Sequence, residues 1–209
     1  MGSPVTLYYF DGRGRGEVIR WILHAAGQNF KDERVDHAEW VKNPQMKTKS
    51  PLGQLPYIEV NGKTLGQSHA IGRYLARQHG LAGKDAWEEA EVDALVDFTE
   101  DIYKGWINWL HAKMENDPKV DDIRKQFLTA DIVPYLQQYE TILGRNKSGY
   151  LVGQGPTWAD FTAVGFLDEL VLMDQSILTS HPELQEYVDR VHNLKGIKEW
   201  LAKRQKTEF

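Results

Sequence analysis

The sequence of 209 residues contains no cysteine. This absence excludes disulfide bonds, metal sites built on thiolates and redox chemistry on a thiol of the protein itself. The sequence also lacks an apolar run near the roughly 18 residues that a membrane-spanning helix needs, and it has no long tract of lysine and arginine. We therefore expect a cytoplasmic protein that does not associate with membranes.

The charge balance argues against nucleic acid as a partner. Formal net charge is -5 and the isoelectric point is near 5.8, so no general positive field would attract phosphates. Hydrophobic residues make up 41% of the chain, with seven Trp and nine Tyr, which is enough for a sizeable core. The length suits one large domain or two small ones.

The N-terminal third shows strand and helix signals in alternation. Strands are expected at Val5–Phe10 and Phe30–Val35, with a helix over Glu17–Ala26 between them. Asn61-Gly62 predicts a two-residue hairpin turn between strands at Tyr57–Val60 and Lys63–Leu65, and a helix capped by Ser68 follows it. The order is therefore βαβ followed by ββα.

After Gly80 the strand signals cease and every long periodic segment is helical. We expect one helix over Asp85–Lys113, another over Asp121–Leu143 with a kink at Pro134, and further helices launched by capping-box patterns at Thr157 and Ser180. The predicted fold class is α/β plus all-α, with an N-terminal domain over residues 1–80 and a helical bundle over 84–209.

A phenol and two guanidiniums flank the first strand-to-helix turn. Tyr9 ends the strand, and Arg13 and Arg15 alternate with glycines before the helix starts. A hydroxyl donor and a positive charge would favour the thiolate of a substrate, because a free thiol with a pKa near 8.5 is mostly protonated at neutral pH. The alternative is a half-buried strand aromatic followed by a solvated loop, and the spacing alone leaves both open.

Two further segments are candidates for binding an extended peptide. Pro56, after Gln54 and Leu55, would in the cis form turn the backbone edge of Leu55 outward, and otherwise it is an ordinary proline at a strand start. Gln67 and Ser68 open a helix, where free N–H groups would stabilise a carboxylate, although a plain helix cap fits equally well.

Acidic residues form a stripe on the first long helix. Asp93, Asp97, Glu100 and Asp101 share one face, which is either well hydrated or in contact with cations. A cation site usually needs loop oxygens as well, and the seven histidines show no close pair with metal-ligand spacing. No metal site is predicted.

Several motifs, in order along essentially the whole chain, resemble the sigma class of cytosolic glutathione transferases, which includes glutathione-dependent prostaglandin D synthases. The motifs are Tyr9 to Glu17, Trp40, Gln54-Leu55-Pro56, Gln67 to Leu75 and Thr157 to Phe161. The resemblance implies a thioredoxin-like first domain, an all-helical second domain that supplies the electrophile pocket, and a homodimer. Glutathione would be a co-substrate, with no permanently bound cofactor.

The resemblance also assigns roles to individual residues. Tyr9 would hydrogen-bond the glutathione sulfur with Arg15 beside it, and Asp101 would reach the glutathione of the partner subunit. The other residues implied in glutathione binding are Trp40, Lys47, Gln54, Leu55, Pro56, Gln67 and Ser68. The electrophile pocket would include Gly12, Tyr103, Trp106, Thr162 and Phe209.

Some positions depart from the family pattern. Thr162 replaces an aromatic typical of prostaglandin-converting members, which favours conjugation of hydrophobic electrophiles over prostaglandin isomerisation. Asp97, Glu100 and Asp101 match an acidic cluster that binds magnesium or calcium at the dimer interface of some members, but the glutamate at position 100 departs from it. A non-catalytic ligand carrier or structural relative is the remaining alternative.

Overall fold

The structure is a computed structural model and describes residues 4–207. Its internal contacts divide the chain into two compact units. The first joins the N-terminal segment up to Ala82 with the C-terminal segment from His192, and the second comprises Gly83–Val191. The expected division into domains 1–80 and 84–209 remains a prediction, and each unit is described by itself.

The first unit contains a mixed four-stranded sheet with the order β2-β1-β3-β4. The strands β1 (Val5–Phe10) and β2 (Phe30–Val35) are parallel, and β3 (Tyr57–Val60) and β4 (Lys63–Gly66) form the expected hairpin. Asn61 and Gly62 have φ angles of 51° and 71°, which the two central residues of a type I′ turn require. The local sequence signals therefore place all four strands correctly.

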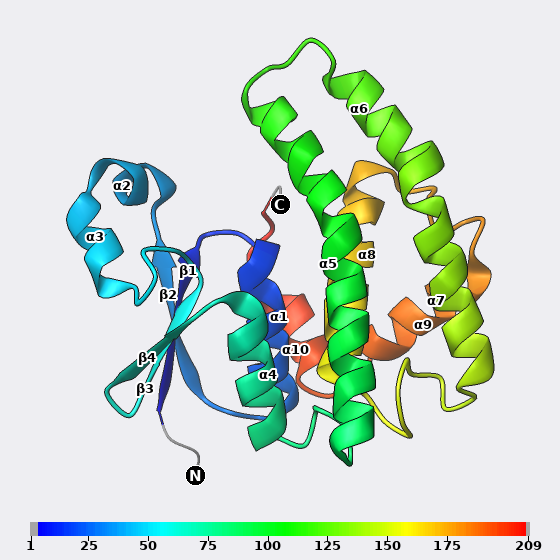
Figure 1. Cartoon of the computed structure of the whole chain (residues 1–209), viewed down its shortest axis with the longest axis horizontal. Coiled ribbons are helices and arrows are strands. Elements are labelled where there is room, and N and C mark those ends of the chain that lie inside the picture. Colours follow the sequence, from blue (N-terminus) through cyan, green and yellow to red (C-terminus); the bar gives the residue numbers. More distant parts are fainter. Residues whose placement is uncertain (1–3, 208–209) are drawn as a thin grey trace. The chain divides into compact units, whose positions relative to one another are not determined.

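Five helices belong largely to this unit. α1 (Gly14–Ala25) and α4 (Ser68–Gln78) pack on each other, and α10 (Ile197–Lys203) also contacts α1 (Figure 1). Two short helices, α2 (His37–Lys42) and α3 (Pro44–Lys49), occupy the polar segment that gave only a weak helical signal. The expected cap of α4 is wrong by one residue: Gln67 is the N-cap and Ser68 is the first helical residue.

The strand register gathers four chain segments at one edge of this sheet. Phe10 lies opposite Val35, so β1 and β2 end together. Tyr8 pairs with Tyr57 and Tyr57 with Gly66, so β3 begins and β4 ends at that same edge. The loops before α1, before α2, before β3 and before α4 therefore all start or finish there. The sheet and its helices have the thioredoxin-like arrangement, which confirms the predicted fold class.

The second unit is helical. Its elements are α5 (Ala86–Met114), α6 (Val120–Gln126), the π-helical segment η1 (Phe127–Asp131), α7 (Val133–Arg145), α8 (Trp158–Met173) and most of α9 (Pro182–His192). α8 packs on α5 and is buried over most of its surface, as the fully buried Trp158 and Phe161 show. The long helix expected at Asp85–Lys113 is confirmed, with Asp85 as its N-cap.

The helix expected over Asp121–Leu143 with a kink at Pro134 forms as three consecutive segments, α6, η1 and α7. The π-helical turn of η1 is wider than an α-helical turn, because Ile132 N donates to Phe127 O, five residues earlier, at 3.1 Å. Pro134 explains the break, because it has no N–H to donate to the carbonyl four residues earlier and its ring would clash with that carbonyl.

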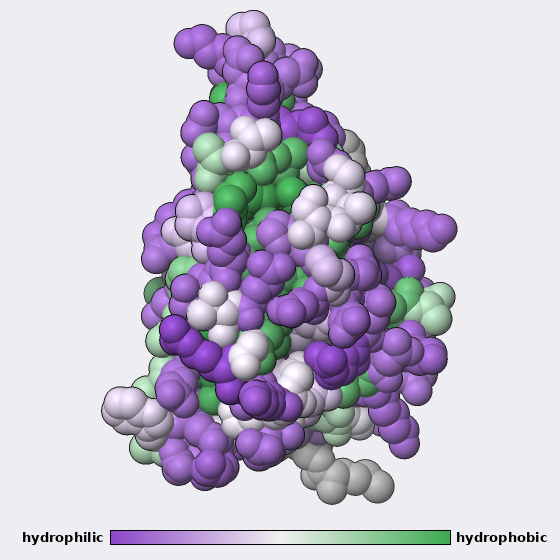
Figure 2. All heavy atoms as spheres, turned by 90° about the vertical axis from the view of Figure 1, so that its right-hand side faces the viewer, coloured by the Kyte–Doolittle hydropathy of each residue, from purple (hydrophilic) through white to green (hydrophobic). Residues whose placement is uncertain are grey.

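Hydrophilic residues cover most of the face that Figure 2 presents, and hydrophobic residues are visible in smaller patches between them. In the part of the chain that the structure describes, no helix combines the length and the apolar character needed to cross a bilayer.

The capping box of α8 is a buried hub of the second unit. Asp160 is fully buried and accepts hydrogen bonds from Thr157 N at 2.7 Å, Leu151 N at 2.9 Å and the hydroxyl of Tyr187 at 2.9 Å. Burial raises the pKa of this carboxyl, and the hydrogen bonds offset part of that rise. One side chain therefore joins the start of α8, the preceding loop and α9.

Asp160→Ala is expected to lower the free energy of unfolding by about 3 kcal/mol, because it leaves several buried donors without an acceptor. Asp85→Ala is the matched control, since Asp85 caps α5 through Trp87 N and Glu88 N but is exposed. Its loss should cost about 1 kcal/mol. Urea unfolding measures both, and equal losses would contradict the hub role of Asp160.

Candidate functional site

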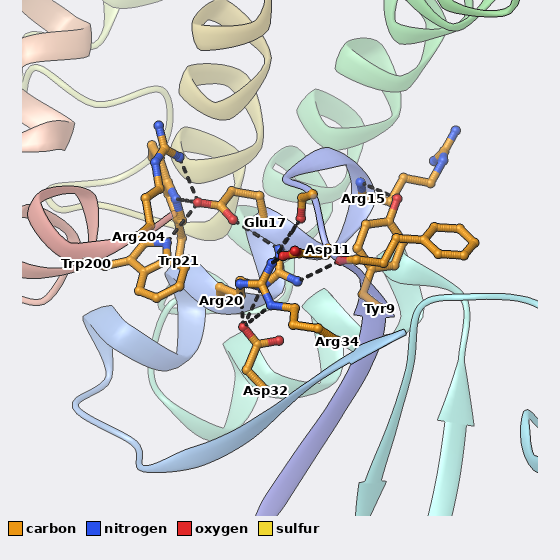
Figure 3. Close-up of polar contacts among 12 residues, drawn as sticks. Tyr9, Asp11, Arg15, Glu17, Arg20, Trp21, Asp32, Arg34, Trp200 and Arg204 are labelled. Atoms are coloured by element: carbon orange, nitrogen blue, oxygen red, sulfur yellow. Dashed lines mark hydrogen bonds and ion pairs between the residues drawn. The ribbon is translucent and has the colours of Figure 1, made fainter. Parts of the chain in front are cut away.

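The phenol oxygen of Tyr9 lies at the N-terminus of α1. The backbone N–H of Arg15 donates to this oxygen at 3.1 Å (Figure 3). Arg13, the N-cap residue of α1, makes no side-chain capping bond to the helix. A side chain of β1 therefore satisfies one of the N–H groups that a helix start leaves without an intrahelical partner.

Arg15 contacts Tyr9 differently from what the charge argument suggested. Its contact with the phenol oxygen runs through the peptide N–H, and Figure 3 shows the guanidinium extending away from that oxygen. The N-terminus of α1, which is the positive end of the helix dipole, thus faces the phenol oxygen. Arg13, considered as a solvated loop residue, is buried, and its Nη1 donates to Thr207 O at 3.1 Å.

Gly16 allows the ring of Tyr9 to lie against the helix start. A Cβ at this position would stand 2.4 Å from Cδ1 and 2.7 Å from Cγ of Tyr9. No side chain fits at such distances without moving the ring. Close approach of backbone and ring therefore explains the glycines at positions 14 and 16.

Beneath this loop lies a group of charged residues that sequence reasoning missed, here named the Glu17–Arg20 cluster: Glu17, Arg20, Asp32 and Arg34. Arg20 is fully buried and donates to Gly12 O at 2.7 Å, to Glu17 Oε2 at 3.2 Å and to Asp32 Oδ2 at 3.0 Å. Its guanidinium carbon also lies 5.8 Å from the centre of the Tyr9 ring. The sequence contained one indication of this cluster: the charged residues Glu17 and Arg20 lie among the apolar residues of α1.

Arg34 ties the same loop to β2. Its guanidinium donates to Asp32 Oδ2 at 2.9 Å and to Asp11 Oδ1 at 3.3 Å, and it approaches Gly12 O at 3.5 Å. Gly12, expected in the electrophile pocket, thus has its carbonyl oriented by two arginines. The cluster fixes the backbone on both sides of the turn that follows Tyr9.

The segments before β3 and α4 meet at the same edge of the sheet. The bond between Leu55 and Pro56 is cis, as considered from the sequence. Gln67 Nε2 donates to Gln54 Oε1 at 3.2 Å, so two of the expected glutathione-binding residues are neighbours. Gln67 has a φ of 72°, unusual for a residue with a side chain, and Ser68 is buried just behind it.

Trp40 and Lys47 come from the two short helices after β2. Trp40 is buried on α2, with its ring edge-on to Phe10 at 6.4 Å between centroids. Lys47 is exposed on α3. Their expected contacts with glutathione remain predictions.

The remaining expected residues belong to the second unit, except for Phe209, which lies outside the described residues. Tyr103 and Trp106 on α5 have ring centroids 5.1 Å apart, and Tyr103 meets Phe166 of α8 edge-on at 5.7 Å. Thr162 lies one turn before Phe166 and donates to Trp158 O at 2.8 Å. Phe166 was missed by sequence reasoning, although its spacing from Thr162 places both on one helical face.

The acidic stripe of α5 is partly exposed. Asp101 is exposed and pairs with Lys104 at 2.8 Å, while Asp97 is also exposed and Glu100 partly so. Within residues 4–207, no three histidine or carboxylate side chains gather closely enough to hold a metal ion.

The C-terminal segment packs against α1 within the first unit. Trp200 of α10 stacks on His24 with 4.6 Å between ring centroids and 20° between planes, and its Nε1 donates to Glu17 Oε1 at 2.8 Å. Arg204 Nη1 donates to the same oxygen at 2.8 Å. Burial raises the pKa of Glu17, but Arg20 and Arg204 outweigh this and hold it below its usual value.

Comparison with known proteins gives a consistent picture. The family models "Glutathione S-transferase, N-terminal domain" and "Glutathione S-transferase, C-terminal domain" match residues 5–77 and 100–204. A Caenorhabditis elegans protein named probable glutathione S-transferase 7 is 38% identical over 204 residues, which are 96% of this chain and 97% of that protein.

Solved structures agree with these matches. The hookworm glutathione S-transferase Na-GST-3 of Necator americanus, described as monomeric, has a TM-score of 0.90 and 36% identity, with 98% of this chain and 99% of that one covered. A structure titled prostaglandin synthase D of Nilaparvata lugens has a TM-score of 0.86 and 30% identity, with 97% and 100% covered.

Gly16→Ala is expected to destabilise the protein by about 1 to 3 kcal/mol and to displace the Tyr9 ring, since the added methyl overlaps it. Gly144→Ala is the matched control: it lies inside α7, and a Cβ there would have nothing within 4 Å. That change should be neutral or stabilising by up to about 1 kcal/mol. Urea unfolding measures both variants, and a neutral Gly16→Ala would contradict the packing described.

A pH dependence of stability follows from His24. Burial lowers the pKa of this imidazole and Lys203 adds to the effect, so the folded state binds a proton less readily than the unfolded state, whose value is 6.5. Stability should therefore fall as the pH drops below about 6.5. His24→Phe keeps a ring against Trp200 and should make the free energy of unfolding depend less on pH between about pH 7 and 5. An identical slope in His24→Phe would refute this role.

Proposed function

The chain belongs to the glutathione S-transferase family, and from this premise we propose that Tyr9 activates glutathione for attack on hydrophobic electrophiles. In the proposed reaction the hydroxyl of Tyr9 donates a hydrogen bond to the glutathione sulfur. This bond stabilises the thiolate relative to the thiol, because a donor favours the charged form. The thiol proton passes to solvent, and the thiolate then attacks an electrophilic carbon of the second substrate. The C–S bond of a thioether forms as the bond from that carbon to its leaving group breaks, and the leaving group departs with the electron pair of the broken bond.

The bond between Arg15 N–H and Tyr9 is the observation that supports this proposal most strongly. The phenol oxygen accepts in that bond, which holds it at the N-terminus of α1. An oxygen that accepts from a peptide N–H at a helix start is also a better hydrogen-bond donor, because the two bonds polarise each other. Tyr9 can act in this way as a neutral hydroxyl.

The sheet edge around Tyr9 offers matching groups for the rest of the tripeptide. The N-termini of α1 and α4 both lie at this edge, and helix N-termini stabilise carboxylates. We assign Gln67 and Ser68 to the γ-glutamyl carboxylate, Leu55 to the cysteinyl backbone, and Trp40 and Lys47 to the glycine end. Gln54 supports Gln67 by accepting a hydrogen bond from its side-chain amide.

The electrophile is assigned to the aromatic residues of α5 and α8. Tyr103, Trp106 and Phe166 form a connected group of rings in the second unit. Membership of the sigma class and a homodimer in which Asp101 contacts the partner's glutathione extend this proposal. They rest on the motifs of the sequence and on the exposure of Asp101.

A second candidate is isomerisation of a prostaglandin endoperoxide to the D form. The likeness to the Nilaparvata lugens protein titled prostaglandin synthase D favours it, and the threonine at position 162 weighs against it. Product analysis with the endoperoxide and glutathione separates the two candidates: isomerisation yields a rearranged prostaglandin, and conjugation yields a thioether.

Tyr9→Phe is expected to lower kcat for conjugation by about 10- to 100-fold, with the KM for glutathione changed by about threefold or less. The lost hydrogen bond to a charged sulfur corresponds to roughly 1.5 to 3 kcal/mol and acts on the activated state. The measurement is steady-state kinetics with a chromogenic electrophile and varied glutathione.

Tyr8→Phe is the matched control for this substitution. Tyr8 precedes Tyr9 on β1, and its ring stacks on Tyr57 at 4.4 Å with 6° between planes, so the ring contact survives the loss of the hydroxyl. Its kinetics should match those of the unaltered protein. Near-full activity in Tyr9→Phe would remove Tyr9 from the catalytic role.

A further inference from the structure

Glu17 joins the turn after Tyr9 to a segment more than 180 residues further along the chain. Its Oε1 accepts from Trp200 Nε1 and Arg204 Nη1, both at 2.8 Å, and from Trp21 Nε1 at 3.0 Å. Its Oε2 accepts from Arg20. Both oxygens of a buried carboxylate are thus engaged, and two of the donors come from α10 and the residue after it.

Arg20 connects Glu17 to the turn after Tyr9. The same Nη1 that contacts Glu17 donates to Gly12 O at 2.7 Å, and Nη2 approaches Phe10 O at 3.5 Å. Phe10 and Gly12 lie within the segment that leads from Tyr9 to Arg15. In Figure 3, Glu17 and Arg20 lie between Tyr9 on one side and Trp200 with Arg204 on the other. The position of Arg20 therefore fixes the backbone conformation of the turn whose Arg15 N–H donates to Tyr9.

A second contact also joins the C-terminal segment to the turn after Tyr9. Arg13, one residue before the start of α1, donates to Thr207 O at 3.1 Å. The C-terminal segment from Trp200 to Thr207 thus contacts the turn both through the Glu17–Arg20 cluster and directly. All of these residues belong to the first unit, so the contacts lie within one compact body.

We infer that Arg204 and Trp200 are positioning residues for thiol activation: acting through Glu17 and Arg20, they hold the turn so that Arg15 N–H meets the oxygen of Tyr9. This inference rests on the proposed role of Tyr9. Without Arg204, the buried carboxylate of Glu17 has one cation instead of two and draws Arg20 away from Gly12 O. The turn then loses its fixed geometry, and small misplacements of catalytic groups lower rates sharply.

The test compares Arg204→Gln, Arg204→Lys and Trp200→Phe, with Lys203→Gln as the control. Lys203→Gln removes a charge from an exposed neighbouring position of α10. Trp200→Phe keeps a ring against His24 and removes one donor to Glu17. This variant therefore tests the inference even if loss of Arg204 prevents folding. Each variant is measured for thermal unfolding, for kcat and KM, and for the pH at which the thiol of bound glutathione ionises, followed by its thiolate absorbance.

Arg204→Gln is expected to lower kcat about tenfold, to raise the pH of thiol ionisation and to change the KM for glutathione by about twofold or less. Trp200→Phe should shift both readouts in the same direction by less, Arg204→Lys should restore most of the loss, and Lys203→Gln should match the unaltered protein. In a Tyr9→Phe background, Arg204→Gln should lower kcat little further, because both changes act on one interaction.

Two failures are distinguishable. If Tyr9→Phe lowers kcat but the Arg204 and Trp200 variants shift only the unfolding temperature, leaving kcat and the thiol ionisation unchanged, the two residues are structural and the inference is overturned. If Tyr9→Phe itself retains full activity, the proposed function fails, whatever the other variants do.

Discussion

The hydrogen bond from Arg15 N–H to the phenol oxygen of Tyr9 is the interaction on which the rest of the site depends. It joins the end of β1 to the start of α1, satisfies a helix N–H that would otherwise lack an acceptor, and orients the hydroxyl. The absence of cysteine makes this geometry consequential, because the sulfur must come from the substrate. In the proposed reaction the protein contributes the groups that ionise and orient this sulfur.

Close packing and buried charge both maintain this bond. Gly16 lets the Tyr9 ring lie against the helix, and Arg20 holds the carbonyl of Gly12 beneath it. A buried arginine is tolerable because Glu17 and Asp32 compensate its charge, and removing one partner of such a pair typically costs about 3 to 5 kcal/mol. The same cluster therefore links stability to the geometry of the turn after Tyr9.

Local sequence signals predicted most of the fold and part of the site. The four strands and the long helix α5 follow from periodicity and turn chemistry. The role of Tyr9 was expected from the family resemblance, because its spacing alone left an ordinary strand aromatic equally open. The cluster beneath it did not follow, because Glu17 meets Arg204 across 187 residues. The φ of 72° at Gln67 was equally hidden, because the local preference of serine for the cap position pointed to Ser68, whereas Gln67 occupies that position. The break before Pro134 was expected as a kink, but its form depends on packing.

The central claim concerns where the sulfur lies relative to Tyr9. A crystal structure of the protein with glutathione tests it most directly. The account predicts that the sulfur lies within hydrogen-bonding distance of the Tyr9 oxygen while Arg15 N–H still donates to that oxygen. A sulfur bound by another group, with the phenol out of contact, would contradict it.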